Sequence, residues 1–333
     1  MWIEAFSEAK DPSRPETNED ALVILPGRAF GVIDGVSDRS GVRYDGMLSG
    51  CYAARLLQRA LERLLGSDAA PLDDPAAIAR AMTAEIAAAY DRLGIADAVA
   101  RDRNRQIQAT LTLLTLAGDA AHLLIVGDSG ARLNGDTLIR EEKDLDAITA
   151  SLRRIAWPVI AARVADPAER ERLSRLVTWQ GTRNARPLVA PTLDQNDLDA
   201  VEAETKRVCR DTLPHVPEAD IATLVEGGIV HGQGRYQNNT ASVLGYSCLN
   251  GFPVPPSLIR VERFDRMALR SVELFTDGYF APGEAFGVDG WERRFAEVER
   301  EDPSKVLRYP SPKGSVGGTW ADDRTYLGTR FHP

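Results

Sequence analysis

Two pairs of short apolar runs, each pair joined by a tight turn, constrain the fold of this chain most. Leucine and β-branched residues in runs of this length, separated by Gly, Pro or Asp, are typical of antiparallel hairpins. The sequence therefore predicts two hairpins of buried strands. The first pairs residues 21–25 with 29–33 around Pro26-Gly27, and the second pairs 109–117 with 121–126 around Gly118-Asp119.

Helical patterns alternate with these strands. Residues 44–65 and 75–93 carry apolar side chains at three-to-four-residue spacing, and a later segment places Trp291, Phe295 and Val298 on one stripe, as amphipathic helices do. Strands followed by helices and then by strands again favour an α+β layered fold over a βαβ array. Further strands are predicted at 241–247, 257–264, 271–276 and 323–331.

The middle of the chain, residues 142–236, is polar, helical in pattern and interrupted by prolines, which indicates an insertion or cap. Residues 151–190 hold eight Arg, no Lys and three acids, whereas residues 191–230 hold nine acids and three bases. Opposite charge in adjacent segments favours pairing within the insertion. Recognition of a substrate or partner by the arginines is the alternative.

Composition excludes several classes of protein. With 40 Lys+Arg against 49 Asp+Glu, a net charge of −9 argues against nucleic acid as the main partner. No stretch has the length and apolarity of a membrane span, and the first residues lack a signal-peptide pattern. Three scattered cysteines exclude a disulfide framework, so we expect a reducing, cytoplasmic location.

Acidic residues stand at the ends of five predicted strands. Any one of them is explained by a turn, because Asp-Gly and Asp-Ser-Gly are favoured turn sequences. Acids at five strand ends of one sheet system would repel one another in the absence of basic neighbours, unless a cation lies between them. They are Asp20, Asp34, Asp128, Asp277 and the pair Asp322-Asp323.

Oxygen ligands of this kind select Mg²⁺ or Mn²⁺. Two such ions can make hydroxide from a bridging water and support an in-line attack on phosphorus. The acids therefore predict a metal-dependent phosphatase.

The order of the acidic motifs resembles that of metal-dependent protein phosphatases of the type 2C class, in their bacterial form. The likeness covers most of the chain outside 142–236. It implies one phosphatase domain over 1–333, folded as a four-layer α-β-β-α sandwich of two antiparallel sheets, with 142–236 as a helical insertion or extended flap. The motifs are TNEDALVI, AFGVIDG, ATLTLLTLAGDAAHLLIVGDSGARL, SVELFTDGYF and ADDRTYL.

The resemblance implies roles for the main metal ligands. Asp34 resembles the carboxylate that bridges two ions, and the carbonyl of Gly35 resembles a ligand of one of them. Asp277 and Asp322 resemble the remaining carboxylates. Asp34 and Asp277 are therefore the predicted catalytic residues.

Four further residues receive supporting roles by the same resemblance. Asp20 resembles an acid that acts through metal-bound water, Asp128 a ligand of a third ion, and Asp323 a residue just outside the ligand set. Arg14 is the predicted phosphate-binding arginine, although it lies one residue farther from Asp20 than the family spacing and an ordinary surface arginine is the alternative.

The chain departs from the family pattern at two places. Val36-Ser37-Asp38 follows Gly35 where the family has His or Met and two glycines, so a histidine general acid is missing and water would protonate the leaving group. Gly130 stands where an arginine is usual. Ser129 is not expected to be a nucleophile, because no G-x-S-x-G elbow surrounds it.

The leading hypothesis is a phosphoprotein phosphatase that hydrolyses phosphoserine or phosphothreonine with two or three Mg²⁺ or Mn²⁺ ions. A metal-bridging hydroxide would attack phosphorus directly, without a phosphoenzyme. Its partner is then a phosphorylated protein, with no nucleic acid and no membrane. The alternatives are a non-catalytic scaffold of the same fold that binds a regulatory partner, and a phosphatase for a small metabolite.

Overall fold

A computed structural model of the chain describes residues 1–36 and 41–331. The chain divides into two compact units. The first comprises Met1–Glu141, Tyr246–Phe295 and Asp322–Pro333, and the second comprises Glu142–Gly245 and Ala296–Ala321.

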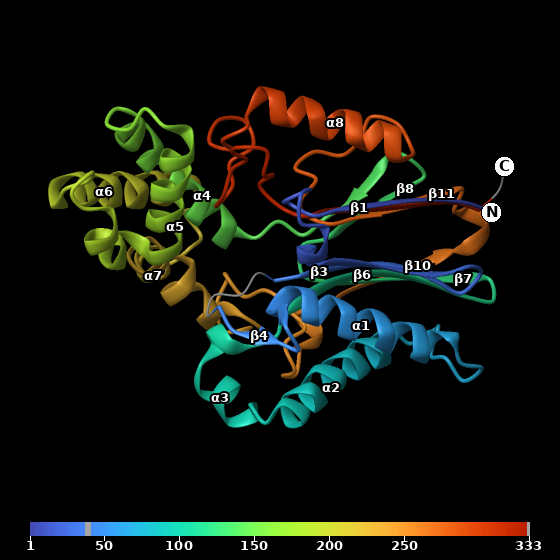
Figure 1. Ribbon diagram of the computed structural model, residues 1–333. Helices are drawn as coiled ribbons and strands as arrows, with labels where there is room; N and C mark the ends of the chain where they lie inside the picture. The colour runs from blue at the N-terminus through green and yellow to red at the C-terminus, as the bar shows by residue number, and fades with distance from the viewer. Residues whose placement is uncertain (37–40, 332–333) are drawn as a thin grey trace. The chain divides into compact units, whose positions relative to one another are not determined.

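The first unit contains two five-stranded antiparallel sheets (Figure 1). The strands are β1 (Trp2–Glu8), β2 (Asp20–Leu25), β3 (Ala29–Gly35), β6 (Ala109–Ala117), β7 (Ala120–Val126), β8 (Gly130–Leu133), β9 (Thr137–Ile139), β10 (Arg260–Asp265), β11 (Ser271–Phe275) and β12 (Arg324–Arg330). One sheet has the order β1-β12-β11-β8-β9 and the other the order β10-β7-β6-β3-β2. Both predicted hairpins are confirmed, as β2–β3 and β6–β7.

The two sheets pack face to face through one buried cluster, in which Val32 of β3 lies with Leu274 of β11 and Leu327 of β12. The opposite face of the β3 sheet, which includes Ile33, packs against helices. Because β3 is covered on both sides, its apolar residues do not alternate with polar ones.

Helices cover the outer faces of both sheets in this unit. α1 (Ser49–Gly66) and α2 (Pro75–Leu93) share a core with β3 and β6, and the short α3 (Ala96–Arg101) follows. The first half of α8 (Val288–Glu301) covers the other sheet, where the Trp291 ring lies 4.6 Å from Phe275 and 5.2 Å from Tyr326. The predicted α+β sandwich of two antiparallel sheets is confirmed.

The helix predicted from residue 44 begins later than expected. Residues 43–48 form a small hairpin of β4 (Arg43–Tyr44) and β5 (Met47–Leu48). Its turn residues Asp45 and Gly46 have φ of 50° and 79°, a left-handed conformation that suits a two-residue hairpin turn. α1 therefore starts only at Ser49.

The strand predicted at 241–247 was wrong. Side chains in this segment bond to nearby backbone and hold turns instead. Asn239 Oδ1 accepts a hydrogen bond from the Ala241 N–H at 2.9 Å, and Ser242 Oγ accepts one from the Leu244 N–H at 3.2 Å. The apolar character of 241–247 therefore does not produce a strand.

Strand β1 was missed by the sequence analysis. It pairs antiparallel with β12 over its whole length, from Trp2 opposite Arg330 to Glu8 opposite Arg324. The aromatic and β-branched residues Trp2, Ile3 and Phe6 in WIEAFSE were the signal that could have found it. Its position matters because it brings the residues that follow it next to Asp323.

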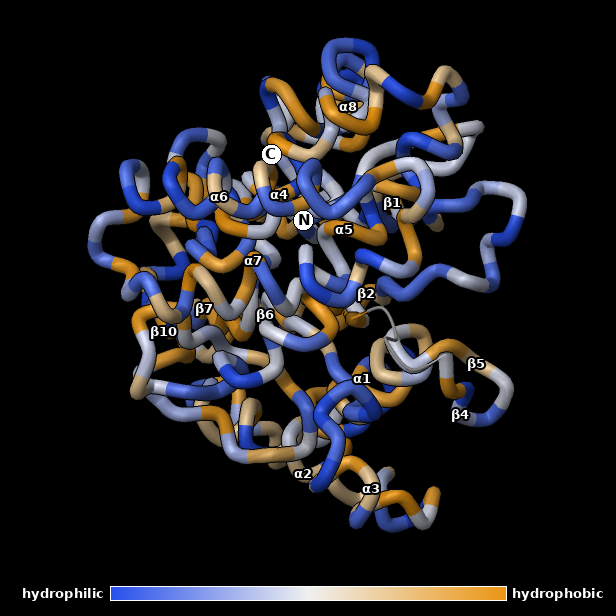
Figure 2. Tube along the Cα trace, turned by 90° about the vertical axis from the view of Figure 1, so that its left-hand side faces the viewer, coloured by the Kyte–Doolittle hydropathy of each residue, from blue (hydrophilic) through white to orange (hydrophobic). Residues whose placement is uncertain are grey.

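The second unit is built mainly of four helices: α4 (Asp144–Ala161), α5 (Pro167–Val189), α6 (Gln195–Thr212) and α7 (Glu218–Gly232). Hydrophilic and hydrophobic stretches alternate along α6 and α7 in Figure 2. Kinks in α5 and α7 meet at Gly181 and Gly228, where a Cβ on Gly228 would lie 2.3 Å from the Gly181 nitrogen. The helical character predicted for 142–236 is confirmed, and its role as a flap stays a prediction.

Opposite charges within this unit pair with one another, as the sequence favoured. Arg163 forms an ion pair with Asp197, and Arg183 forms one with Glu226. Arg186 lies 2.6 Å from Asp199. These three ion pairs each join the arginine-rich segment to the acidic one, so much of the local charge excess is offset inside the unit.

Candidate metal centre

Two of the predicted acids lie directly opposite each other across neighbouring strands. Asp20 of β2 is the register partner of Asp34 of β3. Residues that are directly opposite in an antiparallel pair project to the same face of the sheet. Because Val32 of β3 faces the other sheet, Asp34, two residues later, does so as well. Like charges in such a pair repel, so this arrangement opposes stability unless something offsets it.

Asp128 and Asp277 join Asp34 at the same end of the sandwich. They follow β7 and β11, and one carboxylate oxygen from each of the three lies within 4.8 Å of the others. Asp128 is buried, and the other two are partly buried. The structure thus brings together three of the residues that the sequence predicted as metal ligands.

The turn that carries Asp128 is fixed by hydrogen bonds on both sides. The Gly127 N–H donates to Ser247 Oγ at 2.9 Å. Ser129 Oγ lies 2.9 Å from Thr110 Oγ1, and the Ser129 carbonyl accepts from Thr112 Oγ1 at 2.9 Å. Ser129 is fully buried and held in this network, which agrees with a structural role and not a nucleophilic one.

Close packing explains why residue 130 is a glycine. A Cβ at this position would lie 2.4 Å from Cζ of Phe275 on the adjacent strand, so no larger residue fits without displacing the ring. The arginine that is usual in the family would therefore not be accommodated here. The departure at Gly130 reflects packing between β8 and β11.

Asp20 has one oxygen satisfied by the protein and one that is not. Thr276 Oγ1 donates to Asp20 Oδ2 at 2.8 Å. Asp20 Oδ1 is buried, and no hydrogen-bond donor among residues 1–36 and 41–331 reaches it. A buried carboxylate oxygen without a donor is costly, and a water molecule or cation at this position would satisfy it.

Burial and mutual repulsion raise the pKa values of two of these acids. Burial, followed by the charges of Asp277 and Asp20, raises the pKa of Asp34 well above its usual value. Burial and the charge of Asp323 likewise raise the pKa of Asp20, although the Thr276 hydroxyl acts in the opposite direction. Oxygen donors with this surplus of negative charge fit a hard divalent cation.

Lys10 and Glu19 belong to the centre and were missed by the sequence analysis. Lys10 Nζ lies 2.6 Å from Glu19 Oε2 and 3.1 Å from Asp323 Oδ2. The Lys10 N–H also donates to Asp323 Oδ1 at 2.6 Å. The acids therefore have a basic neighbour on this side of the centre, which the sequence analysis did not identify.

The charge of Lys10 is held by its acidic neighbours. Burial lowers the pKa of Lys10, but the carboxylates of Asp322, Glu19 and Asp323 outweigh burial and raise it above the usual lysine value. Lys10 is therefore a fixed positive charge next to Asp322-Asp323 and Glu19. No signal in the sequence points to it once β1 is missed.

Gly35 lies where two backbones approach closely. Its N–H donates to the Glu19 carbonyl at 2.8 Å, and a Cβ on Gly35 would lie 2.1 Å from the Gly50 carbonyl oxygen in the first turn of α1. Asp322 contributes to the negative potential at Asp34. The ligand roles assigned to Gly35 and Asp322 stay predictions.

Arg14 is not found among these acids. Its side chain is 64% exposed and its Nε donates to Asp11 Oδ2 at 2.6 Å. Within the described part of the chain it makes no ion pair with an acid of the centre. The prediction that Arg14 binds phosphate thus has no support from its position, and an ordinary surface ion pair describes it. Ser37 and Asp38 lie outside the described residues.

Comparison with solved structures finds bacterial serine/threonine phosphatases, the type of enzyme that the acidic motifs resemble. Stp1 from Staphylococcus aureus aligns over 99% of this chain and 95% of its own, with 9% identity and a TM-score of 0.47. PstP from Mycobacterium tuberculosis aligns over 99% of both chains, with 16% identity and a TM-score of 0.44. A catalytic domain of PstP in complex with two manganese ions aligns over 98% and 96%, with 17% identity and a TM-score of 0.47.

No family model matches the chain, and a search of curated proteins finds no match. Similarities at this level of identity and TM-score do not establish activity. The features that bear on function are therefore the geometry and the charge of the acidic centre. Among the described helices, none combines the length and the apolarity needed to span a bilayer.

Proposed function

We propose that this protein is a metal-dependent phosphatase that hydrolyses phosphoserine or phosphothreonine in proteins. The observation that carries the proposal is the gathering of Asp34, Asp128 and Asp277 within 4.8 Å of one another, at an end of the sandwich where buried like charges have no reason to meet for stability alone. The choice of phosphoprotein substrates follows from the resemblance of the ordered motifs.

In this proposal Asp34 and Asp277 hold the divalent ions and are the residues on which turnover depends most. Asp128, Asp322 and the Gly35 carbonyl complete the set, which accommodates two or three Mg²⁺ or Mn²⁺ ions. Bound there, the ions supply Lewis acidity and lower the pKa of water.

The residues around these ligands have positioning roles. Thr276 orients Asp20 through its 2.8 Å hydrogen bond, and Thr110 and Thr112 hold the Asp128 turn through Ser129. Water attacks phosphorus directly in this scheme, since Ser129 is buried and bonded and no other nucleophile is implicated. Water also protonates the leaving group, because Val36 occupies the place of the family histidine.

The test is hydrolysis of p-nitrophenyl phosphate and of a phosphothreonine peptide in Mn²⁺, Mg²⁺ or EDTA. Wild type is compared with Asp277→Asn and with a matched control, Asp91→Asn, which changes an exposed aspartate on α2. We expect turnover that requires metal, falls about 10²–10³-fold in Asp277→Asn and is unchanged in Asp91→Asn. Turnover that survives in EDTA, or that is equal in both variants, would contradict the proposal.

Metal binding without turnover would instead support the scaffold function. The excess of arginine in residues 151–190 would favour a basic docking surface. It supports such a surface less in the structure, because Arg163, Arg183 and Arg186 form ion pairs with acids of the same unit. A metabolite with a kcat/KM far above that of the peptide would support the small-molecule alternative.

A further inference from the structure

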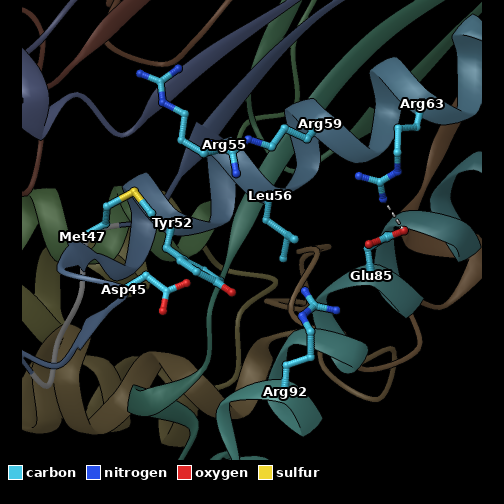
Figure 3. Close-up of a pocket in the computed structure, with 9 residues that line it drawn as sticks. All are labelled: Asp45, Met47, Tyr52, Arg55, Leu56, Arg59, Arg63, Glu85 and Arg92. Atoms are coloured by element: carbon cyan, nitrogen blue, oxygen red, sulfur yellow. Dashed lines mark hydrogen bonds and ion pairs between the residues drawn. The ribbon is translucent and has the colours of Figure 1, made fainter.

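A second charged site lies in the first unit, away from the aspartates. A cavity of about 320 Å³ opens between α1 and α2, and Arg55, Arg59, Arg63 and Arg92 all line it (Figure 3). The size lies at the lower end of the range for small-molecule sites. Four arginines around one cavity are unexpected in a chain whose net charge is −9.

The arginines of α1 lie on one face of the helix. Arg55, Arg59 and Arg63 are spaced by four residues, which places them one above the other. Like charges at this spacing repel, so the three arginines oppose one another along α1. Arg92 approaches from α2 and extends toward α1, as Figure 3 shows.

Only part of this charge is neutralised by the protein. Arg63 Nη2 lies 2.9 Å from Glu85 Oε1 on α2, and Asp45 is the other acid at the cavity. Arg59 and Arg92 have no ion-pair partner within residues 1–36 and 41–331. The cavity therefore carries a surplus of two positive charges over its two acids.

The wall of the cavity also offers apolar surface. Leu56 points from α1 into the space between the helices, and Met47 and Tyr52 line the same space (Figure 3). The Tyr52 ring is itself supported by Tyr44, at 5.8 Å between ring centroids. A guanidinium fork matches the oxygens of a phosphoryl group, and the apolar wall suits a ring or hydrocarbon body.

We propose that the cavity between α1 and α2 binds a small organic phosphate, with the phosphoryl group on Arg59 and Arg92 and the apolar body against Leu56 and Tyr52. The site is separate from the acidic centre. Its existence does not depend on the phosphatase activity proposed above.

The test is calorimetric titration of the full chain carrying Asp277→Asn, in EDTA, so that neither hydrolysis nor metal-dependent phosphate binding contributes. The probes are adenosine 5′-monophosphate, adenosine and inorganic phosphate. We expect saturable binding of the nucleotide, and binding of adenosine and of phosphate alone that is at least about tenfold weaker.

Variants locate the site. On the Asp277→Asn background, Arg59→Gln and Arg92→Gln should each weaken nucleotide binding about tenfold, and Arg63→Gln should weaken it less, because Glu85 already engages that arginine. Arg80→Gln is the matched control, since Arg80 is also exposed on α2 but does not line the cavity. All of the substituted side chains are on the surface, so folding should be retained, and thermal unfolding verifies this.

Three results would overturn the proposal. The first is the absence of saturable nucleotide binding up to about 10 mM. The second is inorganic phosphate that binds as tightly as the nucleotide, which would leave the apolar wall without a role. The third is an equal loss of binding in Arg80→Gln and Arg59→Gln, which would show a general effect of charge.

Discussion

The buried charges around Arg153 in the helical unit and those of the acidic centre in the first unit have very different surroundings. In the helical unit Arg153 is fully buried, and each part of its guanidinium meets an acceptor: it bonds Glu171, donates to Ser174 Oγ at 3.2 Å, and donates to the Ser304 carbonyl at 2.5 Å. Glu171 also accepts from the Gly314 N–H at 2.9 Å. At the acidic centre, by contrast, Asp20 and Asp34 lie beside other carboxylates, and Asp20 Oδ1 has no donor in the described residues.

The difference separates charges that stabilise the fold from charges that oppose it. A network satisfied by its own chain holds segments together, here α4, α5 and the stretch 304–314, and gains nothing from a ligand. A cluster of like charges destabilises its own fold. Lys10 pairs with Glu19 and Asp323 on one side of this cluster, and a cation from outside the chain would relieve the repulsion that remains. Buried charged residues therefore stabilise the fold around Arg153 and destabilise it at the acidic centre.

The largest expected effect is the loss of Arg153. Arg153→Met leaves Glu171 buried without its cation, which should lower the free energy of unfolding by about 3 to 5 kcal/mol. Urea denaturation followed by circular dichroism measures the change. The double variant Arg153→Met with Glu171→Leu should recover part of the loss, because no unpaired charge then remains. A double variant as unstable as the single one would show that the hydrogen bonds from Arg153 to the 304–314 backbone matter more than the charge pair.

For the acidic centre we expect the opposite, namely that removing a charge does not destabilise the fold. Mn²⁺ at about 100 times its Kd should raise the free energy of unfolding by about 2.7 kcal/mol, seen as a higher Tm. Asp34→Asn should lose most of that increase and yet be at least as stable as wild type in EDTA, because one of the repelling charges is gone. Asp91→Asn is the control and should behave as wild type in both conditions. If Asp34→Asn is clearly less stable than wild type in EDTA, then Asp34 serves folding, and the contrast between the two regions fails.

The sequence predicted the strands that carry the aspartates, because buried strands in hairpins have strong local signals: length, β-branched content and Asp-Gly turns. Asp34 and Asp277 follow from that prediction. The turns of 241–247 could not be predicted in this way, since the hydrogen bonds that Asn239 and Ser242 accept from nearby N–H groups compete with strand pairing. Such bonds are not visible as hydrophobic periodicity.

Lys10 shows a second limit of the sequence. Its role depends on the pairing of β1 with β12, which joins residues more than three hundred positions apart. Only that long-range pairing places Lys10 beside Asp323. The positions of the acids along the chain therefore do not reveal that a lysine lies next to them. The pairing of Arg163, Arg183 and Arg186 was predictable in kind from opposite local charge, but the particular partners depend on how the helices pack.

The smallest expected change in the free energy of unfolding is at Asp302 in the helical unit, and it should depend on pH. Burial alone would raise the pKa of Asp302, but hydrogen bonds from the N–H groups of Tyr309, Leu307, Val306 and Arg308 lower it overall from its ordinary value of 3.8. A carboxylate whose pKa is lower in the folded state stabilises the fold above its unfolded pKa, and that contribution is lost as pH falls through the folded-state pKa.

Asp302→Asn should therefore lower the free energy of unfolding by about 2 kcal/mol at pH 7, and the difference from wild type should shrink below pH 3.8, as wild-type Asp302 becomes protonated. Urea denaturation of both proteins between neutral and acidic pH measures the two curves. If the difference in free energy of unfolding between the two proteins stays constant down to the lowest pH measured, then the charge of Asp302 does not stabilise the 302–309 turn. The helical unit would then stabilise its fold without relying on this buried charge, and the contrast with the metal centre would rest on Arg153 alone.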